Sequence, residues 1–171
     1  SELGLVALTK TYRADRLNRY LATITTGRAG MSDVFESIVA TPHAVTEALM
    51  ARDAATPGTN VVMRFDEARV AALVAAAPEL STGLARDTLD KLLELPADEQ
   101  TVLLDTLQAW FDAEGSAAEA GCRLHCHQNT VRYRLNKLAQ LTGRDPRNPG
   151  DLTRLYLARE AVRLLPDQVR G

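Results

Sequence analysis

Residues 116–135 read SAAEAGCRLHCHQNTVRYRL and contain two helical patterns separated by a short turn. The first pattern opens with Ser116 and Glu119, which have the spacing of a capping box. In such a box the serine oxygen accepts from the glutamate amide, and the glutamate side chain returns to the serine amide. A turn of three residues leads into a second helix over residues 128–141. We expect Gly121 to let another helix approach closely, because it has no Cβ.

The second helix has a narrow apolar face and a polar face. Val131, Leu135 and Leu138 recur at helical spacing and predict a buried stripe. The opposite side carries amides and basic groups, and residues 128–141 contain no acidic side chain. A helix, a tight turn and a second helix with a free outer face are typical of a helix-turn-helix, in which the second helix enters the major groove of DNA. The alternative is an ordinary solvated helix face.

The run NTVRYRL at residues 129–135 is the most specific motif in the chain. Other motifs accompany it: GSAAEA at 115–120, LTGRD at 141–145 and PGDL at 149–152. Together they resemble the C-terminal helix-turn-helix of PucR/CdaR-type transcription regulators over about residues 96–165. The resemblance implies a metabolite-responsive transcription regulator that binds double-stranded DNA at specific sequences, through a helix-turn-helix like that of the nucleoid protein Fis.

The resemblance also implies which side chains meet the DNA. They are His127, Gln128, Asn129, Thr130, Arg132, Tyr133 and Arg134, and Lys137 lies on the same cationic helix. We assign Gln128 and Arg132 to base edges, because amides and guanidinium groups pair bidentately with them. Thr130, Arg134 and His127 would hold phosphates. Asn129 would take either role, and for Tyr133 partial packing is the alternative.

The chain up to residue 66 predicts a small α/β region. Its strand candidates are apolar or β-branched runs at residues 3–8, 28–32 and 61–65. Its helix candidates cover residues 14–24 and 42–52, and Thr56-Pro57-Gly58 breaks the second. Residues 1–66 resemble the last portion of a degenerate diguanylate-cyclase-like domain, which usually lies upstream in PucR/CdaR-type regulators.

Beyond residue 66 the sequence predicts helices alone. Residues 68–77 and 84–95 form two helices separated by Pro78 and Gly83. An amphipathic helix begins after Pro96 and ends at Gly115. The helix over 128–141 ends at Gly143, and Asp151 caps a last helix.

The expected fold class is α+β overall, with a small N-terminal α/β region followed by an all-α helix-turn-helix domain. The expected divisions are a partial cyclase-like domain without catalytic motifs at 1–66, a helical connector at 67–95 and the helix-turn-helix domain at 96–171.

Charge is distributed unevenly along the chain. The 171 residues carry 20 basic and 22 acidic side chains, a net charge of −2 that by itself argues against a general nucleic-acid binder. Residues 1–120 hold 10 basic and 18 acidic side chains, whereas residues 121–171 hold 10 and 4, so the two parts carry −8 and +6. A basic C-terminal part beside an acidic body favours contact with a polyanion.

Motifs of catalysis are missing from the sequence. It contains no Gly-Gly-Asp/Glu-Glu-Phe signature, no phosphate-cradling glycine loop and no triad-like arrangement of Ser, His and Asp. His43 stands alone near a helix start, and the Asp66-Glu67 pair after a strand is more typical of a solvated turn than of a metal site. We therefore expect no enzyme, no catalytic residue and no cofactor.

Four metal-ligand side chains, Cys122, His125, Cys126 and His127, lie within six residues. Structural zinc sites usually take ligand pairs from two separated segments, and a helix followed by a turn points these four side chains apart. We expect no metal, with Cys122 in the core, His125 partly buried and His127 at the start of the second helix. Both cysteines are expected as reduced thiols, with a redox switch through Cys126 as the alternative. Cys122 and Cys126 depart from the common pattern of PucR/CdaR-type regulators. Gln128 also departs from it, because proline is frequent at this position in the family.

The expected partners are double-stranded DNA and a second copy of the chain. Helix-turn-helix proteins commonly read paired half-sites about one duplex turn apart, which favours a homodimer. A small-molecule effector would be sensed outside this chain. No apolar run approaches the roughly 18 residues of a membrane helix, so we expect a cytoplasmic protein without a membrane contact. The alternative function is a non-enzymatic protein-interaction or dimerisation module of a signalling protein.

Overall fold

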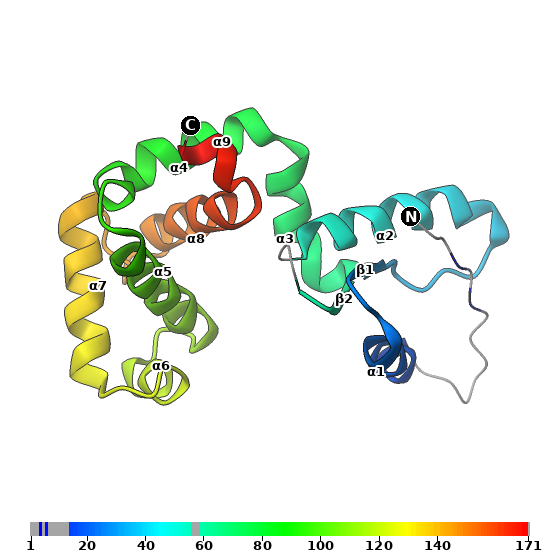
Figure 1. Cartoon of the computed structure of the whole chain (residues 1–171), viewed down its shortest axis with the longest axis horizontal. Coiled ribbons are helices and arrows are strands. Elements are labelled where there is room, and N and C mark those ends of the chain that lie inside the picture. Colours follow the sequence, from blue (N-terminus) through cyan, green and yellow to red (C-terminus); the bar gives the residue numbers. More distant parts are fainter. Residues whose placement is uncertain (1–3, 5, 7–13, 56–58, 171) are drawn as a thin grey trace. The chain divides into compact units, whose positions relative to one another are not determined.

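The computed structural model describes residues 4, 6, 14–55 and 59–170 of the chain, and it divides into two compact units, Ser1–Ala76 and Ala77–Gly171 (Figure 1). The first unit combines helices with a small parallel sheet, and the second is built from helices in its described part. The expected α+β fold class is confirmed.

In the first unit, two parallel strands are joined by a helix. β1 (Arg28–Met31) pairs with β2 (Val61–Arg64) so that Arg28 lies opposite Val61 and Met31 opposite Arg64. Parallel strands need a long crossover connection, which here contains η1 (Ile38–Ala40) and α2 (Thr41–Ala54). The remaining described helices of this unit are α1 (Ala14–Ile24) and α3 (Phe65–Ala76).

Small residues bring α2 against the sheet. A Cβ at Gly30 of β1 would overlap the carbonyl oxygen of Ala48 in α2, so a larger residue at position 30 would push the helix away. On the α2 side the buried positions are alanines, Ala44 and Ala51 among them. The strand and the helix backbone are therefore in direct contact.

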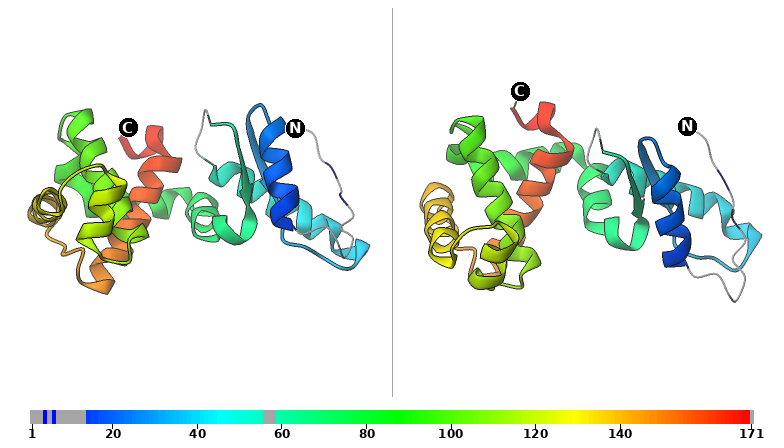
Figure 2. Two further views of the ribbon diagram at one scale, coloured as in Figure 1. Left: turned by 90° about the horizontal axis from the view of Figure 1, so that it is seen from below. Right: turned by 60° about the horizontal axis from the view of Figure 1, so that its bottom comes forward.

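The second unit consists, as far as it is described, of α4 (Pro78–Leu93), α5 (Ala97–Asp112), α6 (Ala117–Arg123), α7 (Gln128–Thr142), α8 (Pro149–Leu164) and α9 (Pro166–Arg170). Its core is rich in fully buried leucines: Leu89, Leu92, Leu107, Leu135, Leu138 and Leu155. α4 packs mainly against α8 and also contacts α7. In both views of Figure 2, α7 lies at the outer edge of this unit.

Several expected elements are confirmed. The helix over 14–24 is α1, the strands near 28–32 and 61–65 are β1 and β2, and the helix over 42–52 is α2. The apolar run at 3–8 lies outside the described residues apart from positions 4 and 6, and so does the Thr56-Pro57-Gly58 break.

Gly83 is not a helix break, contrary to the sequence prediction. It lies inside α4, which begins at Pro78, six residues earlier than expected. A glycine in an exposed helical position costs about 1 kcal/mol relative to alanine. Burial of Ala85, Leu89 and Leu92 on the inner side of the same helix offsets this cost.

Residues 67–95, expected as a helical connector, contain most of α3 and all of α4. α3 belongs to the first unit and α4 to the second, with the division between Ala76 and Ala77. The short helix α9 was not predicted. Arg86 of α4 donates to the carbonyl oxygens of Gln168 (2.7 Å) and Val169 (3.1 Å), which holds the C-terminal segment in place.

Candidate nucleic-acid interface

A small apolar core holds α6 and α7 together. It contains Ala109 and Ala113 at the end of α5, Ala120 of α6, and Val131 and Leu135 of α7. Three of these five side chains are alanine methyl groups, so the helix backbones approach closely. The buried stripe predicted for α7 is confirmed, because Val131, Leu135 and Leu138 are at most 1% exposed.

Gly121 permits the tight turn between α6 and α7. A Cβ at this position would lie 2.7 Å from the carbonyl oxygen of Cys126 and 3.3 Å from the amide nitrogen of Gln128. The Cys126 amide donates to the Gly121 carbonyl at 2.9 Å, which closes the turn. The turn also puts His125 in the left-handed region, with φ of 51°. The expected close approach at Gly121 is confirmed.

Only half of the predicted capping box forms at the start of α6. The Ser116 Oγ accepts from the Glu119 amide at 3.3 Å, as expected. The Ser116 amide, however, donates to the carbonyl of Ala113 at 2.9 Å, so it has no need of the glutamate. The Glu119 carboxylate instead lies 3.5 Å from Arg123, one helical turn further on.

His127 caps the N-terminus of α7. Its Nδ1 accepts a hydrogen bond from the Asn129 amide at 3.2 Å. This bond requires an unprotonated Nδ1, so in the neutral ring the proton is on Nε2, which is available to donate outward. The first amides of a helix together carry a partial positive charge that favours an anion.

Three predicted site residues form one hydrogen-bonded cluster on the outer side of α7. The Arg132 guanidinium donates to the Asn129 side chain (3.2 Å) and to the Gln128 side chain (3.3 Å). Asn129 and Arg132 are exposed, and Gln128 is half-buried. We call Gln128, Asn129 and Arg132 the polar cluster.

Tyr133 lies next to the polar cluster and is 68% exposed. Most of its side chain is therefore accessible. Thr130 and Arg134 are half-buried on the same helix.

Lys137 is bound to a carboxylate within the protein. Its Nζ lies 2.6 Å from Oε2 of Glu99, near the start of α5. The hydrogen bond with Glu99 raises the pKa of Lys137 above its ordinary value. The structure thus brings seven of the eight predicted residues together at the N-terminal half of α7, and it ties the eighth to another helix.

Past the C-terminal end of α7, the chain forms a loop that sequence reasoning described incorrectly. Gly143 ends α7 in the left-handed conformation, with φ of 67°, as expected. The next helix is capped by Asn148, whose side chain accepts from the amides of Gly150 (2.9 Å) and Asp151 (3.2 Å). Asp151, the expected cap, lies inside α8 and accepts from the Asp145 amide at 3.1 Å.

The loop also brings Arg147 to α7, a residue that the sequence analysis did not single out. Its guanidinium donates to the side chain of Asn136 at 2.7 Å. No local pattern links two residues across a loop of this kind. The sequence held only a weak indication of this contact: Asn136 lies on the outer face of α7, and Arg147 is a basic residue in the turn that follows.

Of the cysteines and histidines near the turn, His127 lies at the start of α7 as expected, whereas Cys122 and His125 differ from the expectation. Cys122 and His125 are exposed, whereas Cys126 packs against the small core. The expected burial of Cys122 is therefore wrong, because α6 turns its Ala120 side inward and leaves position 122 in solvent. Among the described residues, no group of three or more His, Cys, Asp or Glu side chains is placed to hold a metal ion.

In the first unit, the acidic pair after β2 and the lone histidine have local partners. Asp66 belongs to the first turn of α3, not to a solvated turn, and it accepts from Nε of Arg64 at 3.0 Å. His43 is exposed and lies 3.2 Å from Glu47 on the same helix.

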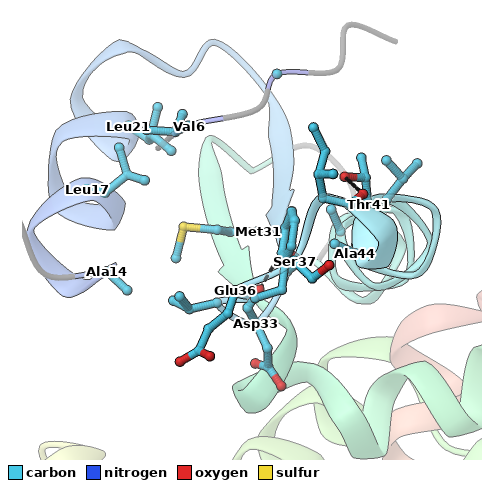
Figure 3. A pocket seen from close by; sticks show the side chains of 18 residues that line it. Val6, Ala14, Leu17, Leu21, Met31, Asp33, Glu36, Ser37, Thr41 and Ala44 are labelled. Atoms are coloured by element: carbon cyan, nitrogen blue, oxygen red, sulfur yellow. Dashed lines mark hydrogen bonds between the residues drawn. The ribbon is translucent and has the colours of Figure 1, made fainter. Parts of the chain in front are cut away.

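Figure 3 shows an open hollow of about 880 Å³ in the first unit. Leu17 and Leu21 of α1 line one side of it, Met31 of β1 lies across from them, and α2 forms the far wall. The side chains of Asp33 and Glu36 lie along the loop after β1. The hollow is mostly apolar, and its acidic groups come from one loop rather than from several converging elements.

Within the described part of the chain, no helix has the length and apolar character needed to cross a membrane.

The comparisons with known proteins point to the same part of the chain. Residues 103–161 match the PucR C-terminal helix-turn-helix domain. An uncharacterized protein of Mycobacterium tuberculosis is 42% identical over 62 residues, which are 36% of this chain and 15% of that protein. The carbohydrate diacid regulator of Escherichia coli is 39% identical over 61 residues, which are 36% of this chain and 16% of that protein.

A longer match is found with the purine catabolism regulatory protein of Bacillus subtilis. It is 30% identical over 139 residues, which cover 80% of this chain and 26% of that protein. The chain thus spans about a quarter or less of the length of these curated relatives. The domain match includes all of α6 and α7, where the polar cluster lies. Residues 103–161 are therefore similar to the PucR C-terminal helix-turn-helix domain.

Proposed function

We propose that the chain is a transcription regulator that binds specific DNA sequences by placing α7 in the major groove. The observation that carries this proposal is the polar cluster at the exposed N-terminal half of α7. Amide and guanidinium groups are the side chains best suited to read base edges.

The packing of α7 supports this proposal. Its inner stripe, Val131, Leu135 and Leu138, is almost completely buried, so the helix is fixed against the rest of the unit. Residues 128–142 contain no acidic side chain, and the helix begins at the turn after α6. A helix held in this way presents its outer face without rearrangement, which lowers the entropic cost of binding.

The polar cluster is arranged for an exchange of partners. In the free protein Arg132 satisfies the side-chain oxygens of Gln128 and Asn129. On binding, these three groups would exchange their mutual hydrogen bonds for bonds to base edges. Because the bonds are on the surface, breaking them leaves no buried polar group unpaired.

Phosphate contacts would surround the polar cluster. The partial positive charge at the start of α7, the Nε2 proton of His127 and the hydroxyl of Thr130 suit one phosphate group. Arg134 supplies a further positive charge, and exposed Tyr133 is available as a hydrogen-bond donor. Lys137 contributes less, because Glu99 already neutralises it.

We also propose that the regulator works in the cytoplasm as a homodimer on paired half-sites, without a catalytic role, and that a small-molecule effector acts outside this chain. Two copies with recognition helices one duplex turn apart would read a palindromic site.

Fluorescence anisotropy with a mixed-sequence duplex over a salt series tests DNA binding. The chain is compared with an Arg132→Ala/Arg134→Ala variant, and with a Lys91→Ala/Arg154→Ala control that loses the same charge at exposed positions of α4 and α8. We expect salt-sensitive binding that weakens more than tenfold in the first variant and much less in the control. Absence of DNA binding at low salt, or an equal loss of affinity in both variants, would favour the alternative function, a protein-interaction or dimerisation module.

A further inference from the structure

We propose that Arg147, on the loop between α7 and α8, anchors a DNA phosphate beside Asn136, in the C-terminal half of the recognition helix. The inference rests on the proposed function and deepens it. It assigns a second phosphate contact, about two helical turns beyond the N-terminus of α7 where His127 lies.

The loop that carries Arg147 is held on several sides. Pro146 is fully buried, and its carbonyl oxygen accepts from Nε1 of Trp110 at 3.3 Å. The Asn148 amide donates to the Asp145 carbonyl at 2.9 Å, and the Asp145 amide donates to Asp151 at 3.1 Å. The residues before and after position 147 are therefore fixed to α5 and α8.

Arg147 itself is directed to the outer side of α7. Its amide donates to Oδ1 of Asp145 at 3.0 Å, and its Nη2 donates to Oδ1 of Asn136 at 2.7 Å. Asn136 is exposed and follows Arg132 by four residues, so it lies one turn further along the same face. The guanidinium, about half exposed, thus continues the row that begins with the polar cluster.

The spacing along α7 fits a duplex. Eight residues separate Gln128 from Asn136, a rise of about 12 Å along the helix axis. The major groove is about 12 Å wide. When the N-terminus of α7 contacts one backbone, a group beside Asn136 lies at the distance of the other backbone.

The guanidinium of Arg147 is only weakly engaged by a carboxylate. Oδ1 of Asp145 lies 3.5 Å from Nη1 of Arg147, at the outer limit of a hydrogen bond. The stronger contact, with Oδ1 of Asn136, is to a neutral amide and does not neutralise the charge. Arg147 therefore retains donors for a phosphate.

The test compares Arg147→Ala, Arg147→Lys, Asn136→Ala and Arg154→Ala in the full chain. Arg154 is an exposed arginine of α8 and serves as the charge-matched control. Anisotropy is measured over a salt series, with one duplex obtained by selection and one of random sequence. Circular dichroism melting checks that each variant is folded.

We expect Arg147→Ala to bind both duplexes about five- to twentyfold more weakly. The slope of log K against log salt should fall in magnitude by about 0.9, the amount for one phosphate contact. Arg147→Lys should keep the slope, because a phosphate contact needs only the charge. Asn136→Ala, which removes the support, should weaken binding two- to threefold with the slope unchanged.

A slope for Arg147→Ala equal to that of Arg154→Ala would overturn the proposal. A loss of affinity for the selected duplex alone would also overturn it, because such a sequence-dependent loss indicates a base contact. The proposed function fails separately, if the unchanged chain binds neither duplex. Binding that is lost in Arg132→Ala but retained in Arg147→Ala refutes only the role of Arg147.

Discussion

At the scale of single residues, the site depends on side chains that serve both the helix and its proposed ligand. His127 is the clearest case, because its Nδ1 caps α7 while Nε2 remains free to donate. Arg132 is another, because it binds Gln128 and Asn129 in the free protein. Substitutions here change local stability and DNA binding together, so each needs a control that separates the two.

Replacement of His127 by alanine should lower the free energy of unfolding by about 1 kcal/mol, the usual loss when a helix cap is removed. His127→Asn should keep most of the stability, because the asparagine oxygen accepts the same amide hydrogen bond. Urea denaturation measures both. Only the imidazole offers the outward Nε2, so both variants should bind DNA more weakly. Equal stability of the alanine and asparagine variants would contradict the capping role.

Removal of the Glu99 charge should release Lys137 for DNA. The two groups lie 2.6 Å apart, so Glu99→Gln frees the ammonium group and removes a nearby negative charge. We expect DNA affinity to rise about two- to fivefold, with a steeper salt dependence. Glu94→Gln, an exposed glutamate at the end of α4, is the control for loss of a carboxylate. An equal rise in both variants would mean that only net charge changed.

At the scale of helices and turns, close approach at glycine shapes the helix-turn-helix. The second unit offers a matched pair of helical glycines. Gly121 meets the backbone of the following turn, whereas nothing lies within 4 Å of a Cβ added to Gly83. The two positions should therefore respond to the same substitution in opposite ways.

Alanine at position 121 should destabilise the unit by about 1–3 kcal/mol, because its Cβ would force the Cys126 carbonyl to move. Alanine at position 83 should stabilise it by about 0.5–1 kcal/mol through helix propensity. Thermal unfolding followed by circular dichroism measures both changes. A stabilising Gly121→Ala substitution would show that α6 and α7 do not meet as described.

Local patterns predicted the elements of the site well. The bounds of α7 were predicted within one residue, because its apolar period, its turn and Gly143 all lie close together in the sequence. Errors arose where local signals competed. Gly83 was read as a break although the buried side of α4 keeps the helix continuous, and Asp151 was preferred to Asn148 as a cap.

At the scale of the whole molecule, contacts between residues far apart in sequence were beyond prediction. Lys137 meets Glu99 across 38 positions, and Trp110 meets Pro146 across 36. No periodicity encodes such pairs, since they depend on how complete helices pack. For the same reason the division at Ala76, which separates α3 from α4, did not follow from the sequence.

The two units contribute different features: the proposed DNA-contacting residues lie in one, and the sheet and the hollow lie in the other. The site residues all come from the second unit, whereas the first unit supplies the parallel strands and the open hollow. The domain match lies within the second unit, and the match with the purine catabolism regulatory protein covers 80% of the chain. The proposed DNA contacts of the second unit and any role of the first unit are therefore open to separate tests by substitution in the full chain.

If α7 reads bases in the major groove, as proposed, replacing purines of the duplex by 7-deazapurines should weaken binding, because this removes the N7 acceptor from the groove. A duplex obtained by selection is synthesised with one N7 atom removed at a time, and anisotropy compares the chain with Arg132→Ala. We expect at least one substitution to weaken binding of the chain by about tenfold, the scale of one lost base contact. The same substitution should have little effect on Arg132→Ala. Unchanged affinity at every substituted purine would contradict major-groove reading by α7.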